Sequence, residues 1–564
     1  MRPRFPTSPV RVFVAAACVV VLMSACQRRQ SPAPADTVVI GIAADVNSFN
    51  PLFASEVTAG EINELLYPML VNSEFDTVSG ALTFSPGLAR RWEFERSGRD
   101  LRFHLNTLAK WSDNTPIGAR DVQYTFELYA DPEVGSVWQS ALDGLQRGSG
   151  GALDIRRAVE IVNDSTVVFH FKQAYPGQLF DVGLPILPAH VFSSIPKEQL
   201  RSHPINQNPV GAGPFRLERH VSMQEIVLSP NPTSVLPYPS RLQRLVFRII
   251  PDYRSRLLQL GSGAIDFMSA IETEDIPRLQ DESSNVDVIP TPPRRYHFIG
   301  WNNIDPGRWT ASRGKQTRAH PLFGSTRVRR ALSMAINRND LTQALLGSYG
   351  IPAFGPVSPI FRTAYDDSLR PLPYDPTQAL ALLKEEGWTD TDGNGMLEKD
   401  GKLFSFALKV PGGNVLWSEI ATVVQKQLRD IHIEARIELV ERSVFWPDLL
   451  SKKYDAWIAG FEVPLEPRLD DMWGSDLQKN PFNVLSYRSA SVDRLLARLR
   501  QNRMPPERAV LLREIQRAIA DDQPCTFLFW ERGRIGVNKR VHGIHSTVLA
   551  LTHDAWDWQV TPEK

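Results

Sequence analysis

The sequence predicts an α/β protein with more than one lobe, each built on a mixed β-sheet. Two observations support this class. The chain has 564 residues, and at about 100–200 residues per domain this length suits two to four domains. Strand patterns rich in β-branched residues also alternate with helical patterns, first in residues 242–268 and again from 296 to 437. Such alternation favours sheets that are covered by helices.

The N-terminus has the pattern of an export signal. Arg2, Arg4 and Arg11 form a basic region before an apolar run that starts at Val12 and ends in "LMSAC". The run is too short for an ordinary membrane-spanning helix, and its basic start and small-residue end are typical of a secretory signal peptide. We expect residues 1–25 to be this signal and residues 26–36 to be a flexible tether.

Cys26 is the predicted lipidation site. It follows Ser24 and Ala25 in a stretch that resembles a bacterial lipobox, where the signal is cleaved before a cysteine that is then diacylated. A plain signal peptide with an incidental cysteine is the alternative. Cys18 would leave with the signal, so we expect no internal disulfide. Cys525 lies in an apolar run, which favours a buried and inert thiol.

Charge and composition exclude some classes of partner. Lys and Arg number 63, as do Asp and Glu, so the formal net charge is zero. We therefore expect no nucleic-acid partner, because no basic excess attracts a polyanion. The hydrophobic share of 42% is ordinary for a globular protein. A chain of this length can supply the large core that an exported fold without disulfides needs.

Local patterns predict the first elements in order. Residues 37–45 form a β-branched run, which predicts a buried strand, and a turn and a helical pattern follow. Leu101, Phe103 and Leu105 alternate with polar residues. This predicts a half-buried strand, paired with "WEFER" through the turn "SGRD". The segment "TPIGARDVQYTFELY", residues 115–129, then predicts a helix.

Residues 389–401, "TDTDGNGMLEKDG", resemble a calcium loop. Oxygen-bearing side chains occupy positions 1, 3 and 5 of an EF-hand template, but position 12, which needs a bidentate glutamate, is Gly401. A helix with Asp375 as N-cap precedes the loop, and a strand rather than a second helix follows. We expect a polar helix-to-strand turn. Adventitious calcium binding, with help from Glu398, is the alternative.

Taken in order, nine segments resemble one family: the large extracytoplasmic solute-binding proteins of peptide-type ABC importers. This is bacterial family 5, which includes dipeptide, oligopeptide and nickel binders. The most recognisable stretch is "FSPGLARRWEFERSGRDLRFHLNTLAKWSDNTPIGARDVQYTFE", in which Trp111 and Asn114 replace the family's usual phenylalanine and glycine. The segments that follow in family order are "LPILPAHVF", "VGAGPFRL", "GSGAIDFM", "GWNN", "RVRRALSMAINRNDL", "YDPTQALALLKEEGWTDTDGNG", "YDAWIAGF" and "SYRSASVDRLLARLR".

The resemblance implies a two-lobe periplasmic-binding-protein-like fold of type II, in the large class that carries an extra inserted domain. Lobe I would combine residues 36–79, 207–292 and 526–564. The inserted domain would hold residues 80–206, and lobe II residues 293–525. Crossing strands would form a hinge between the lobes, and a ligand would be enclosed there.

The implied function is capture of a peptide or peptide-like solute and its delivery to an ABC permease, from a lipid anchor on the extracytoplasmic side of the membrane. Closure requires only a ligand that contacts both lobes better in the closed state. We expect a monomer without a cofactor, and no enzyme, because GxSxG, HExxH and SxxK constellations are absent from the expected contexts. Alternatives are an oligosaccharide or metal-chelate ligand, a lipid-anchored hydrolase, and a sensory or adhesive role.

The resemblance also implies where a peptide's terminal ammonium is held. Peptide binders in the family use an acidic residue just after the segment that matches "YDAWIAGF". Here the chain continues "EVPLEPRLDDMW", so the family's aspartate–proline pair reads Glu466–Pro467 and the expected aspartate is missing. A buried ammonium without an acidic partner is costly. Glu462 is therefore the first candidate and Glu466 the second, with a solvated loop carboxylate as the alternative.

Four further residues are candidates for the ligand site. Trp301 and Asn302 lie where the chain begins the second lobe, Trp417 follows the "PGGN" turn, and Trp473 lies beside the acidic segment. Packing in a core is the alternative for each tryptophan. The histidines show no metal-ligand spacing such as HxxxH, so we expect no metal site made of protein ligands.

Overall fold

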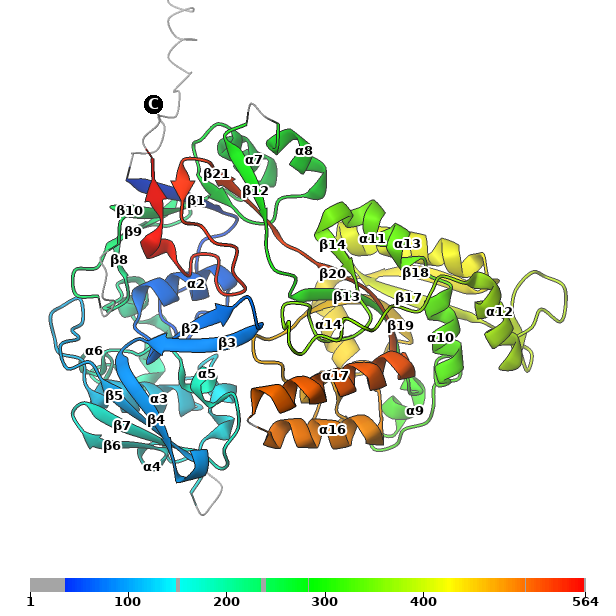
Figure 1. Cartoon of the computed structure of the whole chain (residues 1–564), viewed down its shortest axis with the longest axis horizontal. Coiled ribbons are helices and arrows are strands. Elements are labelled where there is room, and N and C mark those ends of the chain that lie inside the picture. Colours follow the sequence, from blue (N-terminus) through cyan, green and yellow to red (C-terminus); the bar gives the residue numbers. More distant parts are fainter. Residues whose placement is uncertain (1–35, 149–152, 235–239, 282–283, 503, 562–564) are drawn as a thin grey trace, which may run out of the picture.

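The computed structural model describes residues 36–148, 153–234, 240–281, 284–502 and 504–561 (Figure 1). The predicted signal peptide, Cys26 and the tether up to residue 35 lie outside these ranges. In the described part of the chain, no helix is both long enough and apolar enough to cross a membrane.

A mixed seven-stranded sheet supports lobe I. Its strands, in spatial order, are β12 (Val286–Pro290), β21 (Arg534–Asn538), β11 (Phe267–Met268), β1 (Thr37–Ile42), β10 (Arg244–Ile249), β9 (Glu225–Pro230) and β8 (Phe215–Val221). β1 is parallel to β10 and β11, whereas β21 is antiparallel to β11 and β12. The predicted strand at 37–45 is thus confirmed as β1. The helices of lobe I are α2 (Val57–Leu66), α7 (Tyr253–Gly261) and α8 (Ile276–Leu279).

A six-stranded sheet supports lobe II. Its strands, in spatial order, are β14 (Gly350–Pro352), β20 (Cys525–Glu531), β13 (Arg295–Trp301), β19 (Ala456–Glu462), β17 (Ser405–Pro411) and β18 (Glu434–Val440). One face packs against α10 (Thr326–Met334), α11 (Arg338–Leu346), α12 (Pro376–Glu385) and α13 (Val415–Arg429). The other face packs against α14 (Arg442–Leu450), α16 (Ala490–Gln501) and α17 (Pro505–Asp522). Two short helices are α9 (Pro306–Ala311) and α15 (Asp470–Trp473).

The inserted domain is a four-stranded antiparallel sheet with short helices. The strands, in spatial order, are β4 (Ala89–Glu95), β5 (Asp100–Leu105), β7 (Thr166–His170) and β6 (Val159–Asn163). Its helices are α3 (Ala119–Ala130), α4 (Ile155–Ala158), α5 (Gln178–Val182) and α6 (Ala189–Phe192). The predicted hairpin is confirmed, because Phe94 pairs with Leu101 in antiparallel register. The predicted helix that follows is α3.

Three two-stranded sheets complete the strands of the described chain. They are β2 (Val71–Asp76) with β3 (Ala81–Pro86), β15 (Glu398–Lys399) with β16 (Lys402–Leu403), and β22 (Val541–His542) with β23 (Gln559–Val560). In Figure 1 the β2–β3 hairpin lies left of the centre and extends from lobe I toward lobe II.

The chain crosses between the two large sheets at two places. β12 ends at Pro290 and β13 begins at Arg295, whereas β20 ends at Glu531 and β21 begins at Arg534. One prediction is corrected here: residues 526–531 were expected in lobe I, but β20 pairs with β13 and β14 in the lobe II sheet. Because the strand continues to Glu531, the second crossing comes after it.

The loop at residues 389–401 forms the expected turn between α12 and β17. The α12 N-cap is confirmed, because the carboxylate of Asp375 accepts a hydrogen bond of 2.8 Å from the amide of Gln378. In the loop, the Asp390 carboxylate accepts hydrogen bonds of 2.8 and 3.0 Å from the amides of Gly393 and Gly395. These carboxylate oxygens therefore stabilise the turn itself.

Candidate functional site

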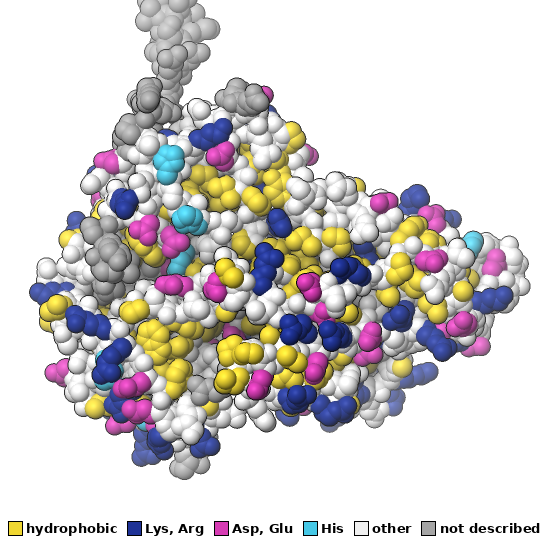
Figure 2. Space-filling model, in the orientation of Figure 1, with side chains coloured by type: hydrophobic (Ala, Val, Ile, Leu, Met, Phe, Trp, Pro, Cys, Tyr) yellow, Lys and Arg dark blue, Asp and Glu magenta, His cyan; other side chains and the backbone are white. Residues whose placement is uncertain are grey.

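A cavity of 740 Å³ lies where the two lobes meet. α2, α5, both crossing segments, the end of β19 and residues 547–556 line it. Its volume is within the roughly 300–1,000 Å³ that is usual for ligand sites. A second cavity of 1030 Å³ adjoins it and shares Thr291, Pro292 and residues 547–549 with it. Figure 2 shows hydrophobic side chains in the middle of one face of the molecule, with basic side chains beside them.

Helix α2 is held against lobe I by a close backbone approach. The amide of Gly213 donates a hydrogen bond of 2.9 Å to the carbonyl of Leu66, at the end of the helix. A Cβ atom at Gly213 would lie 2.3 Å from the Leu65 carbonyl oxygen, so only glycine permits this approach. This contact fixes which face of α2 lines the cavity. Glu61 and Glu64 both lie on that face, because residues three apart on a helix are neighbours.

Glu61 is a partly buried carboxylate without a cationic partner. Its Oε1 atom accepts a hydrogen bond of 3.2 Å from the amide of Leu551. Burial raises the pKa of Glu61 to about 7, and the nearby charge of Glu64 adds to the effect although the Leu551 amide opposes it. Among the residues that the structure describes, no cationic side chain forms an ion pair with Glu61.

Two neighbours of these carboxylates have unsatisfied polar groups. Asn63 and Tyr67 line the same cavity and are 2% and 1% exposed. The amide nitrogen and oxygen of Asn63 and the hydroxyl of Tyr67 have no hydrogen-bond partner in the described part of the protein. Buried polar groups are nearly always paired, so these atoms indicate a missing partner.

His553 closes this corner of the cavity. Its Nδ1 atom lies 3.8 Å from Oε2 of Glu64. Burial lowers the pKa of His553, but the hydrogen bond and charge of Glu64 and the charge of Asp554 outweigh burial and raise it. A protonated His553 therefore offsets part of the charge on Glu64 and leaves Glu61 uncompensated.

Glu462 lines the cavity from lobe II, at the end of β19. Its carboxylate lies 3.2 Å from Arg294 and 3.4 Å from Arg295. The guanidinium of Arg294 also donates 2.8 Å and 3.2 Å hydrogen bonds to the carbonyls of Val548 and Val463. Burial lowers the pKa of Arg294, and Glu462 opposes this shift. Two cations therefore already compensate this predicted ammonium anchor.

Glu466, the second candidate, is placed away from the cavity. Its carboxylate accepts a hydrogen bond of 2.5 Å from Arg508, and both side chains are largely buried, at 19% and 12% exposed. Burial raises the pKa of Glu466 although Arg508 and Arg468 lower it. This glutamate stabilises the fold of lobe II through a buried ion pair.

The other four predicted residues are also inside lobe II and do not line the 740 Å³ cavity. The Trp301 indole nitrogen donates to Thr526 Oγ1 at 3.0 Å, and the Asn302 amide donates to the carbonyl of Tyr454 at 2.9 Å. Trp417 donates to Nδ1 of His297 at 2.9 Å. Trp473 is 1% exposed and stacks on Phe527. The three tryptophans are therefore packed in the core of lobe II, which was the alternative to a role in the ligand site.

The residues on α2 were missed in the sequence. The apolar positions of residues 57–66 predict an ordinary amphipathic helix, and Glu61 and Glu64 are spaced like charges on a solvated face. A weak signal exists in hindsight. At helical spacing Asn63 shares a face with Ala59, Leu66 and Tyr67, which is a poor position for an amide unless it has a partner.

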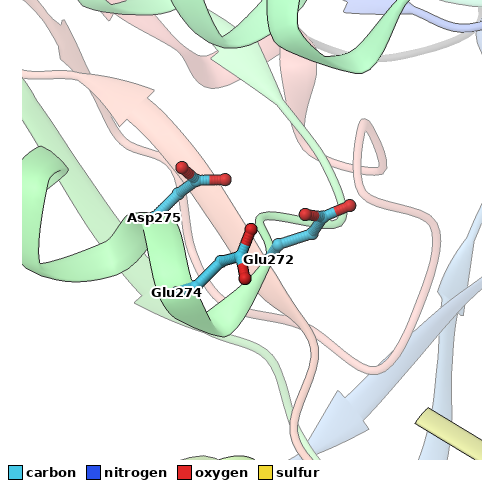
Figure 3. A group of neighbouring side chains, drawn as sticks. All are labelled: Glu272, Glu274 and Asp275. Carbon is cyan, nitrogen blue, oxygen red and sulfur yellow. The ribbon is translucent and has the colours of Figure 1, made fainter. Parts of the chain in front are cut away.

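A separate acidic cluster precedes α8 (Figure 3). Glu272, Glu274 and Asp275 have carboxylate oxygens near one another. Arg254 forms ion pairs with Glu274 at 2.9 Å and with Asp275 at 2.8 Å. The hydroxyl of Tyr253 donates to Asp275 at 2.8 Å. Arg254 and Tyr253 are thus partners of Glu274 and Asp275 from within lobe I, and these contacts explain the position of the two carboxylates.

Comparisons with known proteins agree with this architecture. The model of the bacterial extracellular solute-binding proteins, family 5 (middle region), matches residues 83–473. The oligopeptide-binding protein AppA of Bacillus subtilis is 26% identical over 519 residues, which cover 91% of this chain and 89% of AppA. The solved structure of AppA in complex with a nonapeptide is 25% identical, with a TM-score of 0.71 over 94% of this chain and 100% of that chain. NikZ from Campylobacter jejuni in complex with Ni(L-His), 21% identical, has a TM-score of 0.72 over 93% and 100%.

Proposed function

The chain belongs to the bacterial extracellular solute-binding proteins of family 5, and we propose that it captures a peptide between its lobes for delivery to the permease of an ABC importer. The predicted family and the predicted two-lobe fold are confirmed. One observation carries the proposal: the 740 Å³ cavity is lined by both lobes and by both crossing segments. A ligand there contacts both lobes, and closure is favoured by such contacts.

The ligand class is proposed from relatives and from the chemistry of the cavity. AppA of Bacillus subtilis, an oligopeptide-binding protein, supports a peptide. The cavity combines carboxylates on α2 with guanidinium groups at Arg294 and Arg295, and apolar side chains also line it. A zwitterionic chain with apolar side groups complements this arrangement. Binding and release suffice for transport, so we propose no enzymatic role.

The place of action is proposed as the extracytoplasmic side of the membrane, with the protein held as a monomer on a lipid at Cys26. The family's extracellular character and the lipobox-like "LMSAC" support this. Metabolic labelling with a radioactive fatty acid should mark the parent and a Cys18→Ala control but not Cys26→Ala. A label retained in Cys26→Ala would contradict the anchor.

Peptide capture is tested with protein that has been freed of ligand by unfolding and refolding. The protein is incubated with a casein hydrolysate, and native mass spectrometry identifies the retained peptides. We expect one or more peptides per cavity, and calorimetry with the synthetic peptide should give saturable binding. Maltotriose and a nickel–histidine chelate serve as probes for the two alternative ligand classes. Retention of either one, with no peptide retained, would overturn the proposal.

A further inference from the structure

We propose that α2 of lobe I holds the terminal ammonium group of the bound peptide, with the carboxylates of Glu61 and Glu64 as counter-charges and with Asn63 and Tyr67 as hydrogen-bond partners. This inference rests on the proposed function. It gives the ligand a direction, because the N-terminus is then held by lobe I and the chain extends toward lobe II.

The first argument is charge balance. Glu61 is partly buried at the wall of the cavity, and within the described chain its carboxylate receives a backbone hydrogen bond from Leu551 but no ion pair. A desolvated carboxylate without a cation is unfavourable, and a cation from the ligand would remove this cost. Burial and the charge of Glu64 hold the pKa of Glu61 near 7, which is the behaviour expected of an acid that lacks a partner.

The second argument is hydrogen bonding. An ammonium group has three donors and no acceptor. The Glu61 carboxylate, the Asn63 side-chain oxygen and the Tyr67 hydroxyl oxygen can all accept. The last two are buried at the wall of the same cavity and have no hydrogen-bond partner among the described residues. The free amide nitrogen of Asn63 can also donate to the first peptide carbonyl. One ligand terminus would therefore satisfy several otherwise costly groups.

The third argument concerns the competing position in lobe II. Arg294 and Arg295 flank Glu462 at 3.2 and 3.4 Å, so this cluster has one more positive than negative charge. An ammonium group placed there would have to compete with two guanidinium groups. The cluster instead suits the carbonyl groups or the terminal carboxylate of the peptide, since guanidinium groups bind such oxygens well.

The test uses the peptide retained from the casein hydrolysate, synthesised with a free and with an acetylated N-terminus. Calorimetry compares the parent with Glu61→Gln, Glu462→Gln and a control, Glu56→Gln. The control removes an exposed carboxylate from the start of the same helix, outside the cavity. Melting temperatures confirm that each variant is folded, and the acetylated peptide probes the subsite in the unmodified parent.

We expect the parent to bind the acetylated peptide roughly 100-fold more weakly than the free one, as loss of a buried charged partner implies. Glu61→Gln should bind the free peptide more weakly than the parent by a similar factor, and it should bind the free and the acetylated peptide with similar affinity. Glu56→Gln should match the parent. Equal binding of both peptides by the parent, or discrimination lost in Glu462→Gln but kept in Glu61→Gln, would overturn the inference and leave the proposed function intact. Retention of no peptide would overturn both.

Discussion

At the scale of single residues, three glutamates around the cavity differ in how their charge is compensated. Glu531 accepts a hydrogen bond of 2.9 Å from His297 and pairs with Arg534 at 2.9 Å. Burial alone would raise the pKa of Glu531, but the hydrogen bond from His297 and the charge of Arg534 help to outweigh burial and lower the pKa. Glu462 is compensated by Arg294, whereas Glu61 has no cationic partner among the described residues and burial raises its pKa. We expect the cation that pairs with Glu61 to come from the ligand.

This difference predicts a pH-dependent stability. The folded protein keeps the Glu61 proton up to about pH 7, whereas the unfolded chain releases it near 4.5. Between these values the unfolded state binds fewer protons, so the free energy of unfolding falls as pH rises. We expect Glu61→Gln to match the parent at pH 4.5 and to be more stable by about 2–3 kcal/mol at pH 8.

Urea unfolding of both proteins without peptide, at the two pH values, measures this difference. Glu64 and His553 line the same cavity as Glu61, but both are present in parent and variant, so their own contributions to the difference largely cancel. A parent–variant difference that stays constant between pH 4.5 and 8 would show that Glu61 is already compensated.

At the scale of elements, local patterns predicted the strands and helices but could not predict the site. The alternation of Leu101, Phe103 and Leu105 reflects one buried face of β5, and such a period of two is visible in any window. The compensation of Glu462 is different in kind. It depends on the β13–β19 register, which places Arg295 opposite Glu462 although 167 residues separate them. Residue type identified Glu462 as acidic, whereas only sheet pairing shows that it is already paired.

Local sequence patterns also could not predict the contact between the two crossing segments. The amide of Thr291 donates a hydrogen bond of 2.8 Å to the carbonyl of Gly533. A Cβ atom at Gly533 would lie 2.4 Å from Oγ1 of Thr291. The hinge therefore depends on close contact between the two crossing segments, which are far apart in sequence.

We expect Gly533→Ala to reduce stability by about 1–3 kcal/mol, because overpacking must push the two crossing segments apart. Gly412→Ala is the control, since its Cβ would meet nothing closer than the Val440 carbonyl oxygen at 3.5 Å. Combining Gly533→Ala with Thr291→Ala should recover part of the loss. Urea unfolding gives the free energy of unfolding of the parent, the two single variants and the double variant. An equal loss of stability in Gly412→Ala and Gly533→Ala would contradict a specific contact at the hinge.

At the scale of the whole molecule, closure involves two bodies. One hydrophobic core includes Val38 of β1, Phe103 of β5 and Phe126 of α3, so it continues from lobe I into the inserted domain. These two parts therefore move together. Contacts to lobe II include the edge-on ring contact of Phe75 with Phe361 and a hydrogen bond of 3.1 Å from the amide of Thr363 to the carbonyl of Ser79. The chain connects the two large sheets through the crossing segments, so we expect the motion there.

One ion pair joins the two bodies and should bias the molecule toward closure. Arg468 of lobe II donates a hydrogen bond of 2.6 Å to Asp181 of α5, which is 8% exposed and also accepts 2.6 Å from the hydroxyl of Tyr175. Arg468→Met would leave Asp181 buried with one partner in the closed state but hydrated in the open state. The open population without peptide should grow, and peptide affinity should fall by about tenfold or more.

Small-angle scattering should show that Arg468→Met has a larger radius of gyration than the parent without peptide and the parental value at saturating peptide. Arg500→Met is the control, because it breaks an ion pair with Asp470 inside lobe II. If Arg468→Met and this control had the same radius as the parent, the Asp181 pair would contribute nothing to closure.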